Sequence, residues 1–225
     1  QGVEQAIEKF EVLDNPQRAL EKYHLHDLLN SDIMYAKTFE EPRIQQLLTP
    51  FFSEFWVLYA YTSSSVPPQS TNYARRIHND CPRNIPGYIT NMGLIWPLND
   101  YNENNGAVRV LPGSHKSLSC PSEADFEKYA ITINCMQGSL ILFNALLYHR
   151  TEENKTLNWR HALTMNACRS FMKQRFDWVR MLKKEITTQL NSQARRIIGF
   201  DTRVPVNLDE YFVAPEQRLY KGGQG

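Results

Sequence analysis

The sequence lacks several features that would assign it to a familiar class of protein. No apolar run approaches the about 20 residues that a helix needs to span a bilayer, and no internal repeat is present. With 25 basic against 24 acidic residues, the formal net charge is only +1. No excess of one sign therefore suggests an affinity for nucleic acid or for an anionic membrane surface. We expect neither as a partner.

Cysteine is also scarce, and its spacing excludes a second group of sites. The chain has four cysteines, and no two of them form a C-x-x-C pair, which argues against a zinc ribbon or a redox dithiol. They are Cys81, Cys120, Cys135 and Cys168. The first residues are polar and acidic, so we expect no signal peptide. We expect free thiols and a cytoplasmic location.

The composition that is present predicts one globular domain over residues 1–225. Apolar residues make up 42% and charged residues 22% of the chain, as in soluble folded proteins. Helical spacing dominates about 1–50 and about 169–225, including residues 3–29 and 171–198. Many short strands with regular turns lie between, over about 51–168, and indicate a β-sandwich or jelly roll. The expected fold is an all-β core with flanking helices.

Three of the expected elements bear on function. Residues 55–61 predict a strand, and the polar, proline-containing stretch 63–72 predicts a loop after it. Residues 139–148 read as one buried strand that leads directly to His149. Residues 159–167 predict a further strand.

Two separated signals for metal ligands fit one another. His78-Asn79-Asp80 is an H-x-D motif, and His149 follows after a long central segment. Two imidazoles and one carboxylate leave three positions of an iron ion open, enough for a bidentate co-substrate and dioxygen. Arg160 then offers a planar fork for a carboxylate. An H-x-D alone occurs often by chance, but the combination predicts a non-haem Fe(II) oxygenase that uses 2-oxoglutarate and O2.

Other residues near these motifs receive simpler interpretations. Strand alternation would turn Arg160 inward and His161 away from the site. His115 lies in a Pro-Gly-Ser-His turn, where it is expected to stabilise the turn rather than to act as a fourth ligand. His24 and His26 lie in the N-terminal helical region and are expected at the surface.

A family resemblance adds to this interpretation. Trp96-Pro97-Leu98-Asn99-Asp100, Asn104-Asn105-Gly106-Ala107 and Leu111-Pro112-Gly113-Ser114-His115-Lys116 occur in that order. They resemble the W-x-L-x-D, NGA and PGSHK stretches of the phytanoyl-CoA dioxygenase (PhyH-like) family of Fe(II)/2-oxoglutarate oxygenases. The resemblance covers roughly residues 20–165. One departure is Gly138-Ser139, where relatives often have Gly-Asp.

The resemblance implies a double-stranded β-helix, a cupin-like jelly roll, and a role for each motif residue. His78, Asp80 and His149 would bind Fe(II). Arg160 would hold the distal carboxylate of 2-oxoglutarate with help from the Thr151 hydroxyl. Trp96 matches a family tryptophan that lines the site.

The reaction expected from these residues is hydroxylation of an unactivated C–H bond, with release of succinate and CO2. Asp80 supplies the carboxylate that related halogenases have lost, which argues against halogenation. Desaturation, cyclisation or epimerisation would use the same ligands. A non-catalytic jelly-roll binding protein and a cupin-type zinc or manganese enzyme are the remaining alternatives.

The substrate is expected to be a small metabolite or natural-product intermediate. Loops 63–73 and 81–87 would form its pocket, because binding residues concentrate on loops set on a rigid scaffold. Tyr73, Arg83 and Asn84 are the candidate contacts, although loop arginines are usually only solvated charges. We expect a monomer or a homodimer.

Overall fold

A computed structural model of the protein describes residues 2–11, 21, 23–81 and 83–220. They form two compact units, one drawn from the ranges 1–26 and 61–166 and the other from 27–60 and 167–225. Strands β1 (Trp56–Val66) and β7 (Arg160–Arg169) contribute residues to both. Among the described residues, no helix combines the length and apolar character required to cross a bilayer.

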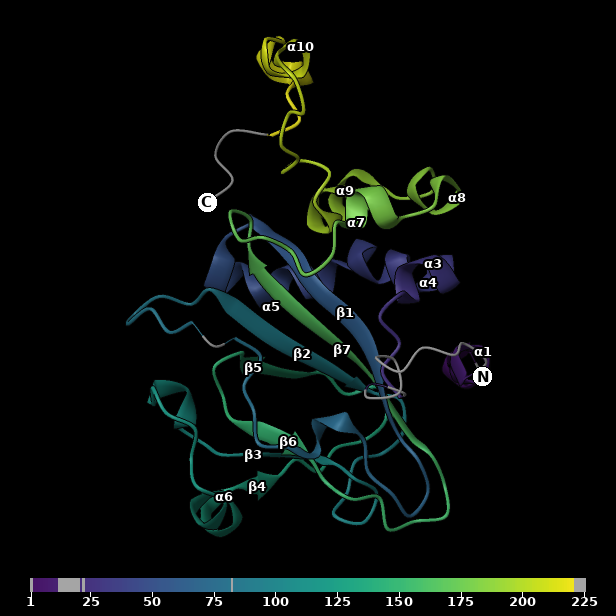
Figure 1. The fold of residues 1–225 in the computed structure, drawn as a ribbon, viewed down its shortest axis with the longest axis vertical. Helices are drawn as coiled ribbons and strands as arrows, with labels where there is room; N and C mark the ends of the chain where they lie inside the picture. The colour runs from purple at the N-terminus through teal and green to yellow at the C-terminus, as the bar shows by residue number, and fades with distance from the viewer. Residues whose placement is uncertain (1, 12–20, 22, 82, 221–225) are drawn as a thin grey trace. The chain divides into compact units, whose positions relative to one another are not determined.

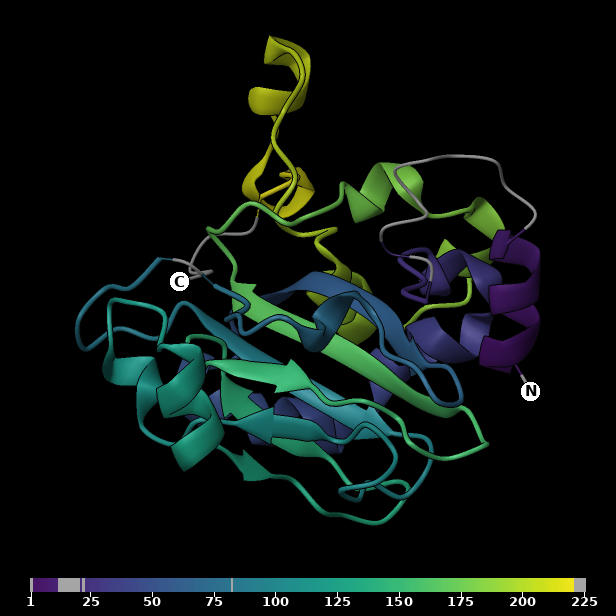
Figure 2. The same ribbon diagram turned by 60° about the horizontal axis from the view of Figure 1, so that its bottom comes forward.

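The first unit contains the strands that carry the candidate site. A four-stranded sheet has the order β1-β7-β2-β5, and a three-stranded sheet has the order β4-β3-β6 (Figures 1 and 2). Strand β2 pairs with β5, and β3 pairs with both β4 and β6, in each case antiparallel. The remaining strands are β2 (Asn91–Pro97), β3 (Val108–Val110), β4 (Ile131–Thr132), β5 (Ile141–Asn144) and β6 (His149–Thr151). Helices α1 (Gly2–Glu11) and α6 (Glu123–Tyr129) and the 3-10 turns η2 (Tyr73–Arg75) and η3 (Ser114–Lys116) complete this unit.

An apolar cluster fills the space inside this unit. Its fully buried members come from β2, β3, β7 and the segment before β3, and side chains of β5 pack against them. They are Ile95, Tyr101, Ala107, Val108 and Ala162. On β2 the glycine at 93 is required, because a Cβ there would lie 2.3 Å from the Phe143 ring. Ile95, Gly93 and Phe143 therefore define the inner face of the four-stranded sheet.

A glycine also explains the Asn-Gly-Ala stretch. Gly106 has a φ of +76°, a conformation that favours glycine. A Cβ at this position would lie 2.8 Å from the backbone oxygen of Glu152, which cannot move aside as a side-chain tip can. The turn therefore holds the start of β3 close to the segment that follows β6.

The second unit is mainly helical. Its helices before β1 and after β7 are α3 (Leu28–Ser31), α4 (Ile33–Lys37), α5 (Pro42–Phe52), α7 (Trp178–Met181), α8 (Lys184–Thr187), α9 (Ser192–Ile198) and α10 (Leu208–Tyr211), with 3-10 turns η1 (Thr38–Glu40) and η4 (Pro215–Gln217). Figure 1 shows α3 and α4 side by side. The side chains of Asp177 and Asn191 cap the N-termini of α7 and α9. The helical spacing over 171–198 therefore corresponds to three short helices, α7, α8 and α9.

Three expectations about elements were wrong in detail. The loop expected over 63–72 begins later, because β1 continues to Val66 with Ser63 and Ser65 fully buried. The single strand expected over 139–148 is interrupted after β5, where the Leu147 N–H donates to the Asn144 carbonyl and turns the chain into the other sheet. Within the helical region expected over 3–29, the structure has α1 over Gly2–Glu11 and the start of α3 at Leu28, but residues 23–26 are not helical. Residues 12–20 and 22 lie outside the described residues.

Candidate metal centre

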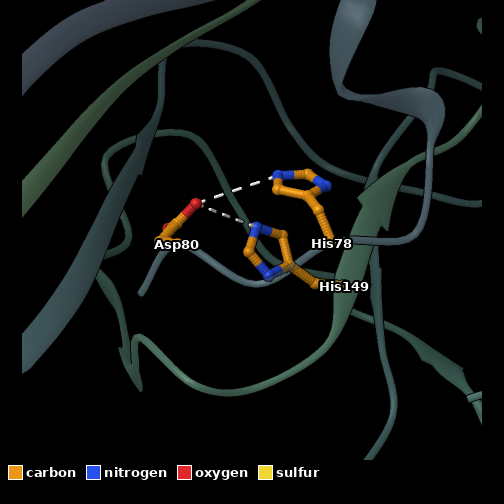
Figure 3. A group of neighbouring side chains, drawn as sticks. All are labelled: His78, Asp80 and His149. Atoms are coloured by element: carbon orange, nitrogen blue, oxygen red, sulfur yellow. Dashed lines mark ion pairs between the residues drawn. The ribbon is translucent and has the colours of Figure 1, made fainter. Parts of the chain in front are cut away.

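The side chains of His78 and Asp80 meet that of His149, a residue distant in the sequence, in the first unit. The Asp80 Oδ1 atom lies 3.8 Å from His78 Nε2 and 3.9 Å from His149 Nε2 (Figure 3). Two donors bound to one ion at about 2.1 Å are at most about 4.2 Å apart. One metal ion can therefore bridge each of these pairs. Among the described residues, this is the one group of three or more such side chains within reach of a single ion.

Backbone hydrogen bonds bring these residues together. His78 and His149 exchange two bonds as an isolated antiparallel bridge, with N···O distances of 3.0 and 2.9 Å. The Asp80 N–H donates to the Ala145 carbonyl at 2.8 Å, in the turn that follows β5. The turn that interrupted the expected strand therefore helps to place the carboxylate beside both rings.

Hydrogen bonds to the other ring nitrogens orient the imidazoles. His78 Nδ1 lies 2.8 Å from the Arg76 carbonyl, and His149 Nδ1 lies 2.9 Å from the Leu147 carbonyl. A carbonyl can only accept, so each Nδ1 carries the proton and each Nε2 presents a lone pair. Burial and then the neighbouring His149 ring lower the pKa of His78 from 6.5 to about 4. Its neutral, ligating form therefore predominates at neutral pH.

Charged side chains on the opposite face of β6 set the orientation of His149. Arg150 binds three carboxylates, those of Glu123, Glu127 and Glu152. Because successive side chains of a strand alternate between faces, this network holds His149 and Thr151 on the inner face. Thr151 is buried and pairs across the sheet with Val108.

Arg160 lies at the start of β7 and is 2% exposed. Its Nη1 donates to the Ser64 carbonyl and the Tyr101 hydroxyl, both at 3.1 Å, and its Nη2 donates to the Gly106 carbonyl at 2.8 Å. Its Nε has no hydrogen-bond partner. No carboxylate pairs with it among the residues that the structure describes. Burial lowers the pKa of Arg160. Its guanidinium is held by three acceptors but has no counter-ion among the described residues.

The other predicted site residues differ in how exposed they are and in which face of the sheet they lie on. Tyr73 is 41% exposed, and the Arg76 guanidinium stacks 4.3 Å from its ring centroid. Arg83 is exposed and Asn84 half-buried, in the loop after Asp80. Trp96 is half-buried on β2, next to Ile95, so alternation puts it on the face opposite to the inner one. The expectation that Trp96 lines the site is therefore corrected.

His24 is a residue that sequence analysis misplaced. It was expected at the surface but is only 8% exposed, and its ring meets the Tyr73 ring edge-on with centroids 6.1 Å apart. Burial is the largest cause that lowers the pKa of His24 from 6.5 to about 4, and the charges of Arg160 and His78 also lower it. The sequence offered no signal, because the assumed helix would have put this position on a solvated face.

We expect His24 to make the metal-free protein less stable in acid. The unfolded state takes up a proton below pH 6.5, whereas the folded state resists it down to about pH 4. The free energy of unfolding should therefore fall as the pH decreases from 6.5 to 4, by up to about 3 kcal/mol from this residue. Denaturant unfolding of the wild type and His24→Asn across this range measures the difference, to which His78 contributes equally in both. Parallel curves for the two proteins would contradict the prediction.

The donor set suits iron. Two neutral imidazoles and a carboxylate leave positions open on a divalent ion, unlike a closed structural zinc site with four protein ligands. The unpartnered Nε of Arg160 suits a carboxylate ligand for the same cation. Both features fit Fe(II) together with a dicarboxylate co-substrate.

Comparisons with known proteins agree with this geometry. A family model described as phytanoyl-CoA dioxygenase (PhyH) matches residues 7–162. Uncharacterised proteins of Mycobacterium bovis and Mycobacterium tuberculosis are each 30% identical over 213 residues, which cover 92% of this chain and 78% of each of those proteins. The dioxygenase sphC of Aspergillus fumigatus is 24% identical over 159 residues, covering 68% of this chain but 42% of that protein.

Solved structures show the same fold. One is EctD from S. alaskensis, solved with 2-oxoglutarate and 5-hydroxyectoine. Its alignment has a TM-score of 0.60 at 15% identity and covers 74% of this chain and 65% of the EctD chain. AviO1 from Streptomyces viridochromogenes has a TM-score of 0.57 at 21% identity, covering 74% of this chain and 80% of that one. The expected jelly-roll core with flanking helices is confirmed.

Proposed function

Since the chain belongs to the phytanoyl-CoA dioxygenase family and is an oxidoreductase of the Fe(II)/2-oxoglutarate-dependent type, we propose that it hydroxylates an unactivated C–H bond of a small molecule. His78, Asp80 and His149 would hold Fe(II), and Arg160 would anchor 2-oxoglutarate. The observation that carries this proposal is the pair of imidazoles whose Nε2 atoms face one carboxylate oxygen at 3.8 and 3.9 Å.

The co-substrate would lie between the metal and Arg160. The guanidinium is buried and has no counter-ion among the described residues, and a bound carboxylate would supply one. Thr151 shares the inner face of β6 with His149, and it pairs across the sheet with Val108. Two residues before Val108, the Gly106 carbonyl accepts a hydrogen bond from Arg160. A hydroxyl from Thr151 would support the same carboxylate.

The protein's own residues would position the reactants. The bonds from His78 and His149 to backbone carbonyls keep both rings in the ligating tautomer before a metal arrives. The fork of Arg160 is held by three acceptors, so little side-chain entropy is lost when a carboxylate binds. When bound, Fe(II), 2-oxoglutarate and dioxygen would supply the oxidising chemistry, which yields succinate and CO2 and transfers one oxygen atom to the substrate.

The substrate would enter beside the loops that flank the H-x-D motif. Tyr73 borders this region and is itself in contact with the buried His24. Arg83 and Asn84 follow Asp80 and are accessible. We propose these three residues as substrate contacts and a small, soluble molecule as the substrate.

The proposal is tested with protein purified without oxygen. Under argon, Fe(II) and 2-oxoglutarate together should produce a visible absorption band that neither produces alone. In air with ascorbate, the protein should then release succinate slowly without added substrate. Tight binding of zinc at one ion per chain, with no 2-oxoglutarate-dependent band, would instead support a cupin-type zinc enzyme. Products from a substrate screen distinguish hydroxylation from desaturation, cyclisation or epimerisation.

A further inference from the structure

Backbone hydrogen bonds attach the segment around His24 to β1. The Ser65 N–H donates to the Tyr23 carbonyl at 3.0 Å, and the Ser63 N–H donates to the Leu25 carbonyl at 3.1 Å. The Leu25 N–H in turn donates to the Ser63 hydroxyl. Ser64, between these two residues, uses its carbonyl to hold Arg160. His24 is therefore attached to the stretch of β1 that also fixes the buried arginine.

Alternation places the His24 side chain on the same face as Arg160. Tyr23 meets the Trp159 ring edge-on with centroids 5.4 Å apart, and Trp159 stacks on His161 at 5.7 Å. These three rings share one face, whereas Arg160, between Trp159 and His161, points to the other. The Ser65 hydroxyl bonds to His161 Nδ1, so on β1 the Ser64 side chain points to the opposite face, that of Arg160. His24 lies across from Ser64, between Tyr23 and Leu25, and shares that face. The effect of the Arg160 and His78 charges on the pKa of His24 agrees with this placement.

Two buried polar atoms on this face are without partners. His24 Nδ1 and Arg160 Nε are both inaccessible to solvent and make no hydrogen bond. A buried donor or acceptor that stays unpaired costs about 1–3 kcal/mol. Native proteins retain such groups rarely, and often where a ligand completes them. A single ligand that reaches both atoms would satisfy both.

We propose that His24 is a further binding residue for 2-oxoglutarate, which donates a hydrogen bond to the carboxylate that Arg160 holds. This inference rests on the function proposed above. A neutral imidazole adds a donor without adding a second buried charge, so the arginine and the carboxylate still balance one another. The Tyr73 ring, which borders the proposed entrance, meets the His24 ring edge-on.

The test compares two 2-oxo acids on Fe(II)-loaded protein under argon. Calorimetry would give the dissociation constants of 2-oxoglutarate and of pyruvate, which has no distal carboxylate. His24→Phe keeps a ring but removes the donor, and should weaken 2-oxoglutarate binding by about tenfold or more while leaving pyruvate binding unchanged. His24→Asn, whose amide nitrogen can replace Nδ1, should recover part of the loss.

His161→Phe is the matched control, because it removes a buried histidine next to Arg160 whose side chain lies on the opposite face. It should leave both dissociation constants unchanged, and melting temperatures would show that each variant is folded. If His24→Phe binds 2-oxoglutarate as tightly as the wild type, or loses both acids equally, the role of His24 at the distal carboxylate is wrong. If the wild type itself binds no 2-oxoglutarate, the proposed function fails instead.

Discussion

Replacing His149 with alanine is expected to abolish both iron binding and 2-oxoglutarate turnover. The change leaves two of three ligands, and changes to residues that merely orient a ligand already cost about 10–100-fold in metal affinity. The loss from removing a ligand should therefore exceed about 100-fold. Metal content after reconstitution with Fe(II), together with succinate release, measures it.

His115→Ala is the control for this experiment. His115 lies in η3, outside the group of three ligating side chains, so its loss should leave the iron content at the wild-type level. Iron retained by His149→Ala would show that the metal is held elsewhere. Iron lost by His115→Ala would revive the fourth-ligand interpretation of the Pro-Gly-Ser-His turn.

Replacing Arg160 with methionine is expected to remove 2-oxoglutarate binding while the iron site persists. Truncating one partner of a buried, hydrogen-bonded charge pair costs about 2–5 kcal/mol, so the dissociation constant should rise by about 100-fold. Arg160→Lys keeps the charge but loses the fork that three acceptors hold in place, and should be intermediate. Calorimetry with 2-oxoglutarate under argon measures both variants.

The iron content provides the internal control for Arg160, because this side chain is not among the candidate ligands. Normal iron with unchanged 2-oxoglutarate affinity would contradict the assignment of Arg160 as the anchor. Loss of iron in Arg160→Met would indicate that the change disturbs the fold around Gly106 and Ser64. Arg160→Lys would then distinguish a disturbed fold from loss of the 2-oxoglutarate anchor.

The local features of the site were readable from the sequence because they depend on short stretches of chain. The turn at Gly106 needs a positive φ and a close backbone approach, which the Asn-Gly-Ala stretch allows. The H-x-D spacing lets His78 and Asp80 present ligand atoms within 3.8 Å of one another. The positive φ and the H-x-D spacing are local, so residue type and spacing suffice to identify them, whereas the approach of Glu152 to Gly106 comes from the tertiary structure.

Where a side chain points was predictable only where the strand had been placed correctly. Alternation on β7 put Arg160 inside, as expected. Trp96 belongs to a recognisable motif, but its face follows from Gly93, Ile95 and their contact with β5. A motif does not contain that register, because pairing partners 46 to 52 residues apart decide it.

By itself, the sequence determined the jelly-roll class, the three candidate ligands, the buried arginine and the family to which the chain belongs. The tertiary structure alone decided that His78 and His149 pair through their backbones, that β5 ends in the turn that holds Asp80, and that His24 is buried. These features arise from hydrogen bonds between segments far apart in the chain. Their energies depend on the packing of the whole unit, and neither local spacing nor propensity encodes them.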